Sequence, residues 1–233
     1  MTLKQIEAHV RQLGDPETAR FLAGYFKTGP GQYGFGDVFV GVKVPAVRKL
    51  ARTFKAQPFA DVTAWLGSAI HEVRLLALLV LVVRFPKASS AEKKAIVDLY
   101  LGNTERINNW DLVDVSAGHI LGAWLWDRER GLLDQLVVSE LLWERRIAII
   151  ATGWFIRKGE VHDTLRLAEI LLPDEEPLLH KATGWMLREV GKRELASLTG
   201  FLDQHARAMP RTMLRYAIER MPELQRQAYL KKN

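Results

Sequence analysis

The sequence has 233 residues, 48% hydrophobic and 26% charged, which suits one large folded domain or an array of repeats and excludes a mainly disordered chain. It has no cysteine, which excludes disulfides, zinc–thiolate sites and a cysteine nucleophile and fits a reducing cytoplasm. The 33 Lys and Arg outnumber the 27 Asp and Glu, and the net charge of +6 favours an anionic partner such as nucleic acid.

Helical periodicity predicts about fourteen helices, joined by short breaks that contain Pro, Gly or Asp. The clearest predicted helices, in chain order, are Arg74–Arg84, Trp110–Trp126, Trp143–Arg157, Leu178–Val190 and Thr212–Met221. Eight of the nine prolines fit helix starts or links: Pro16, Pro45, Pro58, Pro86, Pro173, Pro177, Pro210 and Pro222. Disorder is expected only at Lys231–Asn233. The most hydrophobic run, Leu75–Val83, is too short to cross a membrane, and the first residues lack the apolar stretch of a signal peptide.

The one long irregular stretch is the glycine-rich segment 29–42. Gly29, Gly31 and Gly34 match the dinucleotide fingerprint G-x-G-x-x-G, but a helical segment precedes them and no βαβ unit follows. The segment therefore reads as a loop that joins the N-terminal helices to the rest of the chain and that could contact a ligand. Residues 37–44 are the only candidate for strand-like alternation.

An internal repeat indicates the architecture. Arg74, Trp110 and Arg146 follow one another at intervals of 36 residues, and Lys181 comes 35 residues later. A period near this length with paired helices is typical of HEAT-like arrays. We therefore predict an all-α, right-handed α-solenoid of HEAT-like helix pairs with a concave basic face. It would form a single domain, 1–233, with N-terminal helices and the glycine-rich loop in 1–44 and repeats in 45–230.

Trp110 and Asp114 are the main candidates for chemistry. They are four residues apart, so a helix places the carboxylate and the indole on one face. A persistent carboxylate beside an aromatic wall can stabilise a developing cation or orient a water molecule. The alternative is that Asp111 and Asp114 are ordinary solvated helix acids and that Trp110 is a packing residue.

Cations gather in the C-terminal half at helical spacing, where they could follow a phosphate backbone. The alternative is a set of solvated faces paired with Glu144, Glu189 and Glu194. Trp185 follows Lys181 by four residues and is a second ligand-facing candidate, whereas Trp65, Trp124, Trp126 and Trp154 read as packing residues. No metal-ligand spacing, P-loop or nucleophile motif occurs, so neither a metal nor a cofactor is expected. The candidate cations are Arg145, Arg146, Lys181, Arg188, Arg211 and Arg215.

Three segments, Asn109–Asp114, Trp143–Ala148 and Lys181–Glu189, together with their spacing, resemble the AlkD-type DNA glycosylases. These are HEAT-like repeat enzymes that remove alkylated purines from DNA, and the likeness covers nearly the whole chain. The resemblance implies that Asp114 is the catalytic aspartate and that Trp110 and Trp185 flank the deoxyribose of the lesion. It also implies that Arg146 and Arg188 contact the DNA backbone. Phe21 stands where the family has a tyrosine near the DNA, and Tyr25 is a candidate to replace it.

By this resemblance the chain is expected to be a monofunctional alkylpurine DNA glycosylase, a hydrolase of cationic N3- and N7-alkylated purines in duplex DNA. It is expected to act as a monomer in the bacterial cytoplasm, with the nucleoid. Two alternatives from other classes stay open: a non-catalytic HEAT-like module that binds DNA or DNA structures, and a solenoid that grips a partner protein.

Overall fold

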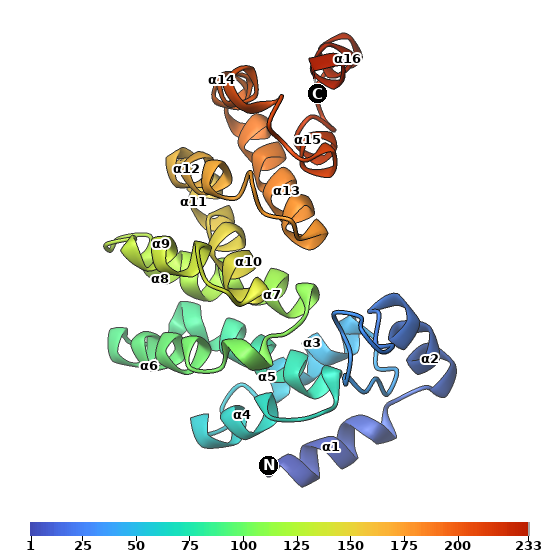
Figure 1. Ribbon diagram of the computed structural model, residues 1–233. Helices are drawn as coiled ribbons and strands as arrows, with labels where there is room; N and C mark the ends of the chain where they lie inside the picture. Colours follow the sequence, from blue (N-terminus) through green and yellow to red (C-terminus); the bar gives the residue numbers. More distant parts are fainter. Residues whose placement is uncertain (233) are drawn as a thin grey trace. The chain divides into compact units, whose positions relative to one another are not determined.

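A computed structural model describes residues 1–232 and shows an all-α protein, as predicted (Figure 1). No strand forms among these residues; the one β-type contact is a parallel bridge between Val38 and Ile70, inside the stretch where alternation was noted. The chain divides into two compact units, Met1–Ser116 and a second that begins at Ala117. Across residues 1–232, no helix combines the length and apolar character needed to cross a lipid bilayer.

The first unit is built around α5, whose first eleven residues are all buried. α5 packs against α3 and α4, and α1 packs on α4 and α5. The ends of the helices follow the expected chemistry: Thr2 and Gln5 form a capping box on α1, and the Asp15 side chain caps α2 ahead of Pro16. The elements are α1 (Leu3–Gln12), α2 (Pro16–Tyr25), α3 (Val44–Thr53), α4 (Phe59–Leu66), α5 (His71–Arg84), η1 (Phe85–Lys87), α6 (Ser90–Leu101), η2 (Thr104–Arg106) and α7 (Trp110–Ala117).

The segment 26–43 connects α2 to α3 and contains the predicted glycine-rich loop. Gly41 has a φ of +88°, and a Cβ at this position would lie 2.0 Å from the backbone oxygen of Asp15, so both conformation and space require glycine. The buried carboxylate of Glu72 accepts hydrogen bonds from the N–H groups of Val40, Gly41 and Val42 at 2.8–3.3 Å. The segment is therefore fixed to α5, although it has no regular structure of its own.

The second unit is a succession of packed helices in which α13 is central. α13 packs against α10, α12, α14 and most extensively α15, and α10 packs against α9. Gly184 of α13 allows this close approach, because a Cβ there would lie 2.4 Å from the backbone oxygen of Met213 in α15. The elements are η3 (Gly118–Gly122, a π-helix), α8 (Ala123–Leu125), α9 (Gly131–Val137), α10 (Leu142–Ala151), α11 (Gly153–Lys158), α12 (His162–Ile170), α13 (Pro177–Arg193), α14 (Leu195–His205), α15 (Arg211–Ala217) and α16 (Glu223–Lys232).

Most predicted helices are confirmed, with some differences at their ends. The helix predicted over Trp143–Arg157 is divided at Thr152 into α10 and α11, and the one predicted over Thr212–Met221 ends at Ala217. α16 includes Lys231 and Lys232, where the sequence predicts disorder; Asn233, the third residue of that prediction, lies outside the described residues. Within each unit, helices pack on their neighbours along the chain in the manner of an α-solenoid. Its handedness, its concave basic face and its reading as one domain stay predictions.

Candidate functional site

Trp110 and Asp114 lie on the same short helix of the first unit, as predicted. Trp110 is the first residue of α7, and its backbone N–H donates to the Asn109 side-chain oxygen at 2.8 Å. Asp114 lies one turn later, and both side chains are half-buried. Burial raises the pKa of the Tyr100 hydroxyl, and the charge of Asp114 adds to that rise, which places the carboxylate near the buried Tyr100. Asp114 is thus neither an ordinary solvated helix acid nor fully enclosed.

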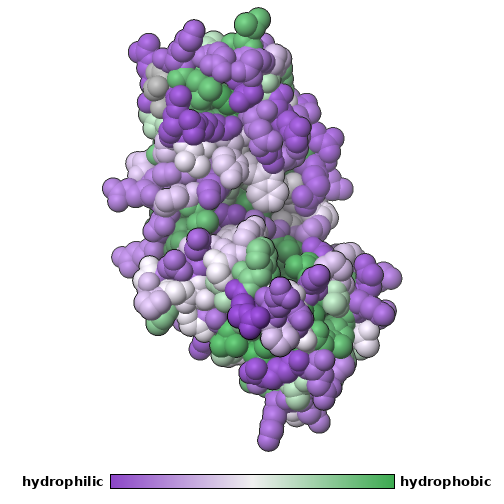
Figure 2. Space-filling model, turned by 90° about the vertical axis from the view of Figure 1, so that its right-hand side faces the viewer, coloured by the Kyte–Doolittle hydropathy of each residue, from purple (hydrophilic) through white to green (hydrophobic). Residues whose placement is uncertain are grey.

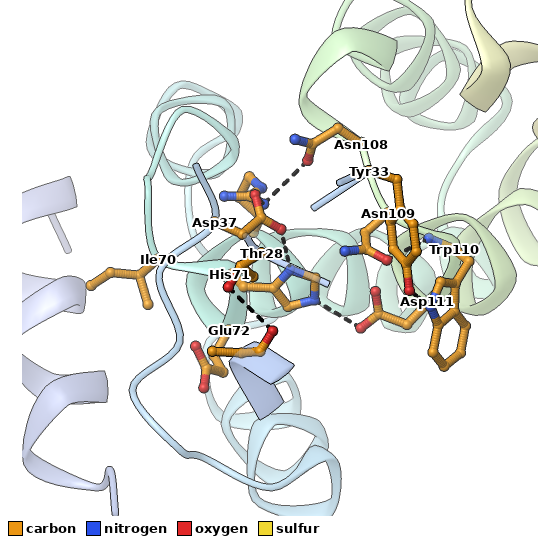
Figure 3. Close-up of polar contacts among 12 residues, drawn as sticks. Thr28, Tyr33, Asp37, Ile70, His71, Glu72, Asn108, Asn109, Trp110 and Asp111 are labelled. Atoms are coloured by element: carbon orange, nitrogen blue, oxygen red, sulfur yellow. Dashed lines mark hydrogen bonds and ion pairs between the residues drawn. The ribbon is translucent and has the colours of Figure 1, made fainter. Parts of the chain in front are cut away.

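The indole of Trp110 is held on several sides. Its ring stacks on Phe26 with centroids 5.1 Å apart, and Tyr25 meets it edge-on at 5.9 Å. Its Nε1–H donates to the hydroxyl of Tyr33 at 3.3 Å (Figure 3). Tyr25 ends α2, whereas Phe26 and Tyr33 belong to the 26–43 segment. This segment, which contains the loop predicted to join helices and to be able to contact a ligand, therefore packs against Trp110.

Phe21 and Tyr25 extend the aromatic cluster outward. The two rings stack with centroids 6.1 Å apart, and they are 68% and 55% exposed. On the face shown in Figure 2, hydrophilic residues cover most of the surface and hydrophobic residues gather in separate patches. Tyr25 contacts both Phe21 and Trp110, and that it replaces the family tyrosine stays a prediction.

Beside Trp110 lies a buried charge cluster that our sequence reading missed. The imidazole of His71 lies between two carboxylates: Nδ1 is 2.9 Å from Oδ2 of Asp37, and Nε2 is 2.8 Å from Oδ2 of Asp111 (Figure 3). Arg74 completes the cluster, because its Nη2 donates to Asp37 at 2.6 Å and to Asn108 at 3.2 Å. Asp37 belongs to the 26–43 segment, His71 and Arg74 belong to α5, and Asp111 belongs to α7.

The charges in this cluster support one another against the cost of burial. Burial opposes a charge on His71, but hydrogen bonds with Asp111 and Asp37 outweigh it and raise the pKa of the imidazole. Burial likewise opposes ionisation of Asp37, but the hydrogen bond to His71 and the charge of Arg74 outweigh it and lower the pKa of the carboxyl. Both groups therefore favour their charged forms.

The structure corrects the repeat register. The start of α5 has a pattern of two hydrogen bonds to one residue. The backbone N–H of the N-cap residue Ile70 donates to the side chain of Ser68, and the side chain of Arg74, four positions after Ile70, donates to the backbone carbonyl of Ser68. The same pattern recurs in α10 and α13. The three sets are Ser68, Ile70 and Arg74; Ser139, Leu141 and Arg145; and Asp174, Glu176 and His180. Arg74 is therefore equivalent to Arg145 and His180. The predicted repeat, which aligned Arg74 with Arg146 and Lys181, is wrong by one residue.

Two candidate cations of the second unit are engaged with backbone carbonyls. Arg145 bonds the carbonyl of Ser139 at 2.8 Å and the carboxylate of Asp174 at 2.8 Å. Arg146 is buried, 4% exposed, and its Nη1 donates to the carbonyl of Leu178 at 2.5 Å, which ties α10 to α13. Both arginines thus connect α10 to the start of α13.

The other candidates gather on α13 and α15, which pack against each other. Trp185 is half-buried, and its indole N–H donates to Glu189 at 3.2 Å; Arg188 pairs with Glu219. Arg211 is exposed and donates to the carbonyl of Leu230 at 2.8 Å. Lys181 and Arg215 are exposed and make no ion pair within residues 1–232.

The four tryptophans that were predicted to be packing residues differ in burial. Trp65 is fully buried, as predicted. Trp124, Trp126 and Trp154 are only half-buried, and each carries a guanidinium over its ring, from Arg128, Arg130 and Arg157 respectively. Over residues 1–232, no group of His, Asp and Glu side chains is arranged to hold a metal ion.

Comparison with known proteins identifies the family and supports the fold. The family described as DNA alkylation repair enzyme matches residues 6–221. Among solved structures, a predicted DNA alkylation repair enzyme from Enterococcus faecalis has the same fold, with a TM-score of 0.71 and 18% sequence identity over 90% of this chain and 97% of that one. No curated protein is similar in sequence. Because the family match spans nearly the whole chain, this protein belongs to the DNA alkylation repair enzyme family.

Proposed function

We propose that this protein is a monofunctional DNA glycosylase that hydrolyses the N-glycosidic bond of cationic N3- and N7-alkylated purines in duplex DNA. The observation that carries the proposal is the pairing of Asp114 with Trp110 on α7, beside an aromatic cluster, in a chain of the DNA alkylation repair enzyme family. The same carboxylate and indole lie in Asn109–Asp114, one of the three segments that together carry the resemblance to AlkD-type enzymes.

The proposed chemistry suits a site with one catalytic carboxylate. An N3- or N7-alkylated purine carries a positive charge, so the electron pair of the C1′–N bond can leave with the base without prior protonation. The sugar then acquires oxocarbenium character, as in other glycoside hydrolysis. Asp114 would stabilise this cation and position the water molecule that attacks C1′, and the faces of Trp110 and Trp185 would favour the same charge. No lysine replaces Asp114 as a Schiff-base nucleophile, hence the monofunctional assignment.

DNA would be held mainly through its phosphates. Lys181 and Arg215 are exposed and unpaired within residues 1–232, which makes them the most direct candidates, and Arg188 and Arg211 lie on the same two helices. Arg145 and Arg146 would contribute from α10, where each already bonds a backbone carbonyl. Phe21 and Tyr25 would contact the DNA near Trp110. We expect no cofactor, a monomer, and a cytoplasmic location with the nucleoid.

A second candidate is a non-catalytic module that binds DNA or DNA structures. The exposed cations of α13 and α15 favour it equally, because phosphate binding does not require Asp114. The two functions differ in whether a base is released.

The test is the release of 7-methylguanine and 3-methyladenine from methylated duplex DNA by the wild-type protein. Release of free base supports the glycosylase. Salt-sensitive binding to the same duplex without release supports the non-catalytic module, and a lack of both points to a partner protein.

A further inference from the structure

The 26–43 segment is attached to the start of α7 at two points. At the first, Asp37 is joined to Asp111 through the imidazole of His71. At the second, the Trp110 indole N–H donates to the Tyr33 hydroxyl. The two residues that receive these attachments, Trp110 and Asp111, form the first turn of α7, and Asp114 lies in the next turn.

The geometry at His71 favours a protonated ring. Both ring nitrogens lie within hydrogen-bond distance of a carboxylate oxygen, and a neutral imidazole can donate from only one nitrogen. The charged groups that face the ring are Asp37 and Asp111, with Arg74 on the far side of Asp37. The adjacent Glu72 carboxylate binds the backbone N–H groups of residues 40–42.

Two aromatic rings, which also stack on each other with centroids 5.0 Å apart, pack against the imidazole. Phe39 stacks on it with centroids 4.4 Å apart, and Phe26 lies 5.2 Å away. Phe26 in turn stacks on Trp110. His71 itself is 1% exposed, so solvent cannot replace a lost hydrogen-bond partner at this position.

Asp111 depends on this contact. Its Oδ2 accepts from His71, whereas its buried Oδ1 has no hydrogen-bond partner among residues 1–232. With His71 protonated, two carboxylates face two cations, and the cluster is neutral. Loss of one proton from His71 leaves one carboxylate without a donor and the cluster with an uncompensated negative charge, which is unfavourable in a buried site.

We propose that His71, held as a cation between Asp37 and Asp111, is a positioning residue that couples the 26–43 segment to the first turn of α7 and thereby fixes Trp110 and Asp114 for the reaction. This proposal rests on the glycosylase function proposed above. It assigns His71 no contact with substrate: the residue acts through the helix that carries the reacting groups. Base release should therefore slow at alkaline pH as His71 loses its proton.

The test combines a spectroscopic titration with kinetics. The ring nitrogens of His71 are followed by ¹⁵N NMR from neutral to alkaline pH, together with hydrogen exchange of the Trp110 indole N–H. The rate of base release at saturating protein and the Kd for methylated duplex are measured over the same pH range. The variants are His71→Gln and Asp111→Asn, and the control is His162→Gln, which changes an exposed histidine of the second unit.

We expect both His71 nitrogens to carry protons at neutral pH, and the Trp110 indole exchange to accelerate as the ring deprotonates. His71→Gln should slow base release by about 100-fold with little change in Kd, because a small misplacement of reacting groups has an effect of that size. Its pH profile should lose the alkaline decline. Asp111→Asn, which removes one stabilising carboxylate, should shift the decline to lower pH. His162→Gln should match the wild type.

A neutral His71 ring at neutral pH, or a titration of His71 that leaves the Trp110 exchange unchanged, would overturn the proposal. So would an Asp111→Asn profile with the wild-type alkaline decline, which remains informative if His71→Gln does not fold. If the wild-type protein released no base, the glycosylase proposal would fail, while the ¹⁵N titration and the indole exchange would still decide whether His71 positions α7.

Discussion

Individual residues of the first unit are fixed by buried polar contacts rather than by apolar packing alone. The Glu72 carboxylate holds three consecutive backbone N–H groups of the 26–43 segment, and His71 and Arg74, from the same turn of α5, hold Asp37. One helical turn of α5 thus organises an 18-residue connection that has no ladder or helix of its own. Such groups are strongly unfavourable when they lose a partner, so single substitutions here should have large effects.

Glu72→Gln should lower the free energy of unfolding by about 1–3 kcal/mol, because the neutral amide loses the charge that strengthens these bonds and its NH₂ would face the Val40 N–H, where Oε2 now accepts at 3.2 Å. The measurement is the denaturant midpoint at constant m-value. Glu129→Gln, at an exposed position, is the matched control and should leave the midpoint unchanged. Equal midpoints for Glu72→Gln and the wild type would show that the 26–43 segment does not depend on this carboxylate.

Stability should also depend on pH through His71 and Asp37. The pKa of His71 is raised in the folded state, so its contribution is complete below the unfolded value of about 6.5 and is lost as pH rises through the folded value. The pKa of Asp37 is lowered, so its contribution is present above the unfolded value of about 3.9 and is lost as pH falls through the folded value. Urea midpoints across this range should therefore decline on both sides. An alkaline decline of equal size in His71→Gln would assign it to another group.

At the scale of helices, the closest contacts between two helices leave no room for a side chain. α13 and α15 approach through Gly184, where an added Cβ would lie 2.4 Å from the backbone oxygen of Met213 and 2.6 Å from Cβ of Tyr216. Neither atom belongs to the end of a flexible side chain, so the helices themselves would have to separate. Four of the six cations proposed to bind phosphate, Lys181, Arg188, Arg211 and Arg215, lie on these two helices.

Gly184→Ala should therefore destabilise the protein by about 1–3 kcal/mol through overpacking. Gly200→Ala is the matched control, because Gly200 also lies in a helix, α14, but a Cβ there would meet no atom within 4 Å. That change should stabilise by up to about 1 kcal/mol through helix propensity. Thermal unfolding of the two variants measures the difference, and a Gly184→Ala protein as stable as the wild type would contradict the packing argument.

Helix periodicity was sufficient to predict most elements and the shared helix of Trp110 and Asp114, because local spacing alone carries that information. The charge cluster was not predictable in this way. Asp37, His71 and Asp111 are separated by 34 and 40 residues, and Asp37 lies in a segment without periodicity. The register error has a local cause: the start of each helix is set by Ser68, Ser139 or Asp174, and 71 rather than 72 residues separate Ser68 from Ser139.

For the whole molecule, the net charge of +6 indicates an anionic partner, but charge alone does not identify the residues that bind it. Among the candidate arginines of the second unit, Arg188 pairs with a carboxylate, and the others apart from Arg215 bond backbone carbonyls. Lys181 and Arg215 differ, since both are exposed and unpaired within residues 1–232. They allow a test of DNA binding that does not disturb the helix contacts held by Arg145 and Arg146.

Lys181→Ala and Arg215→Ala should each weaken binding to duplex DNA and reduce the slope of log K against log salt by about 0.9, the value for one phosphate contact. Their unfolding midpoints should stay at the wild-type value, because neither side chain holds another element. Lys55→Ala, which removes an exposed cation outside the predicted set, is the control. An unchanged slope in both variants would mean that these cations do not face the DNA.

The central claim, that Asp114 performs the chemistry, is tested most directly by Asp114→Asn, which keeps the shape of the side chain and removes its charge. Base release from methylated duplex DNA should fall by about 100-fold or more, since a preorganised charge that stabilises the developing cation is lost. Affinity for the same duplex should be unchanged or slightly higher, and the exposed-site variant Asp98→Asn should behave as the wild type. An Asp114→Asn protein that releases base at the wild-type rate would remove Asp114 from the mechanism.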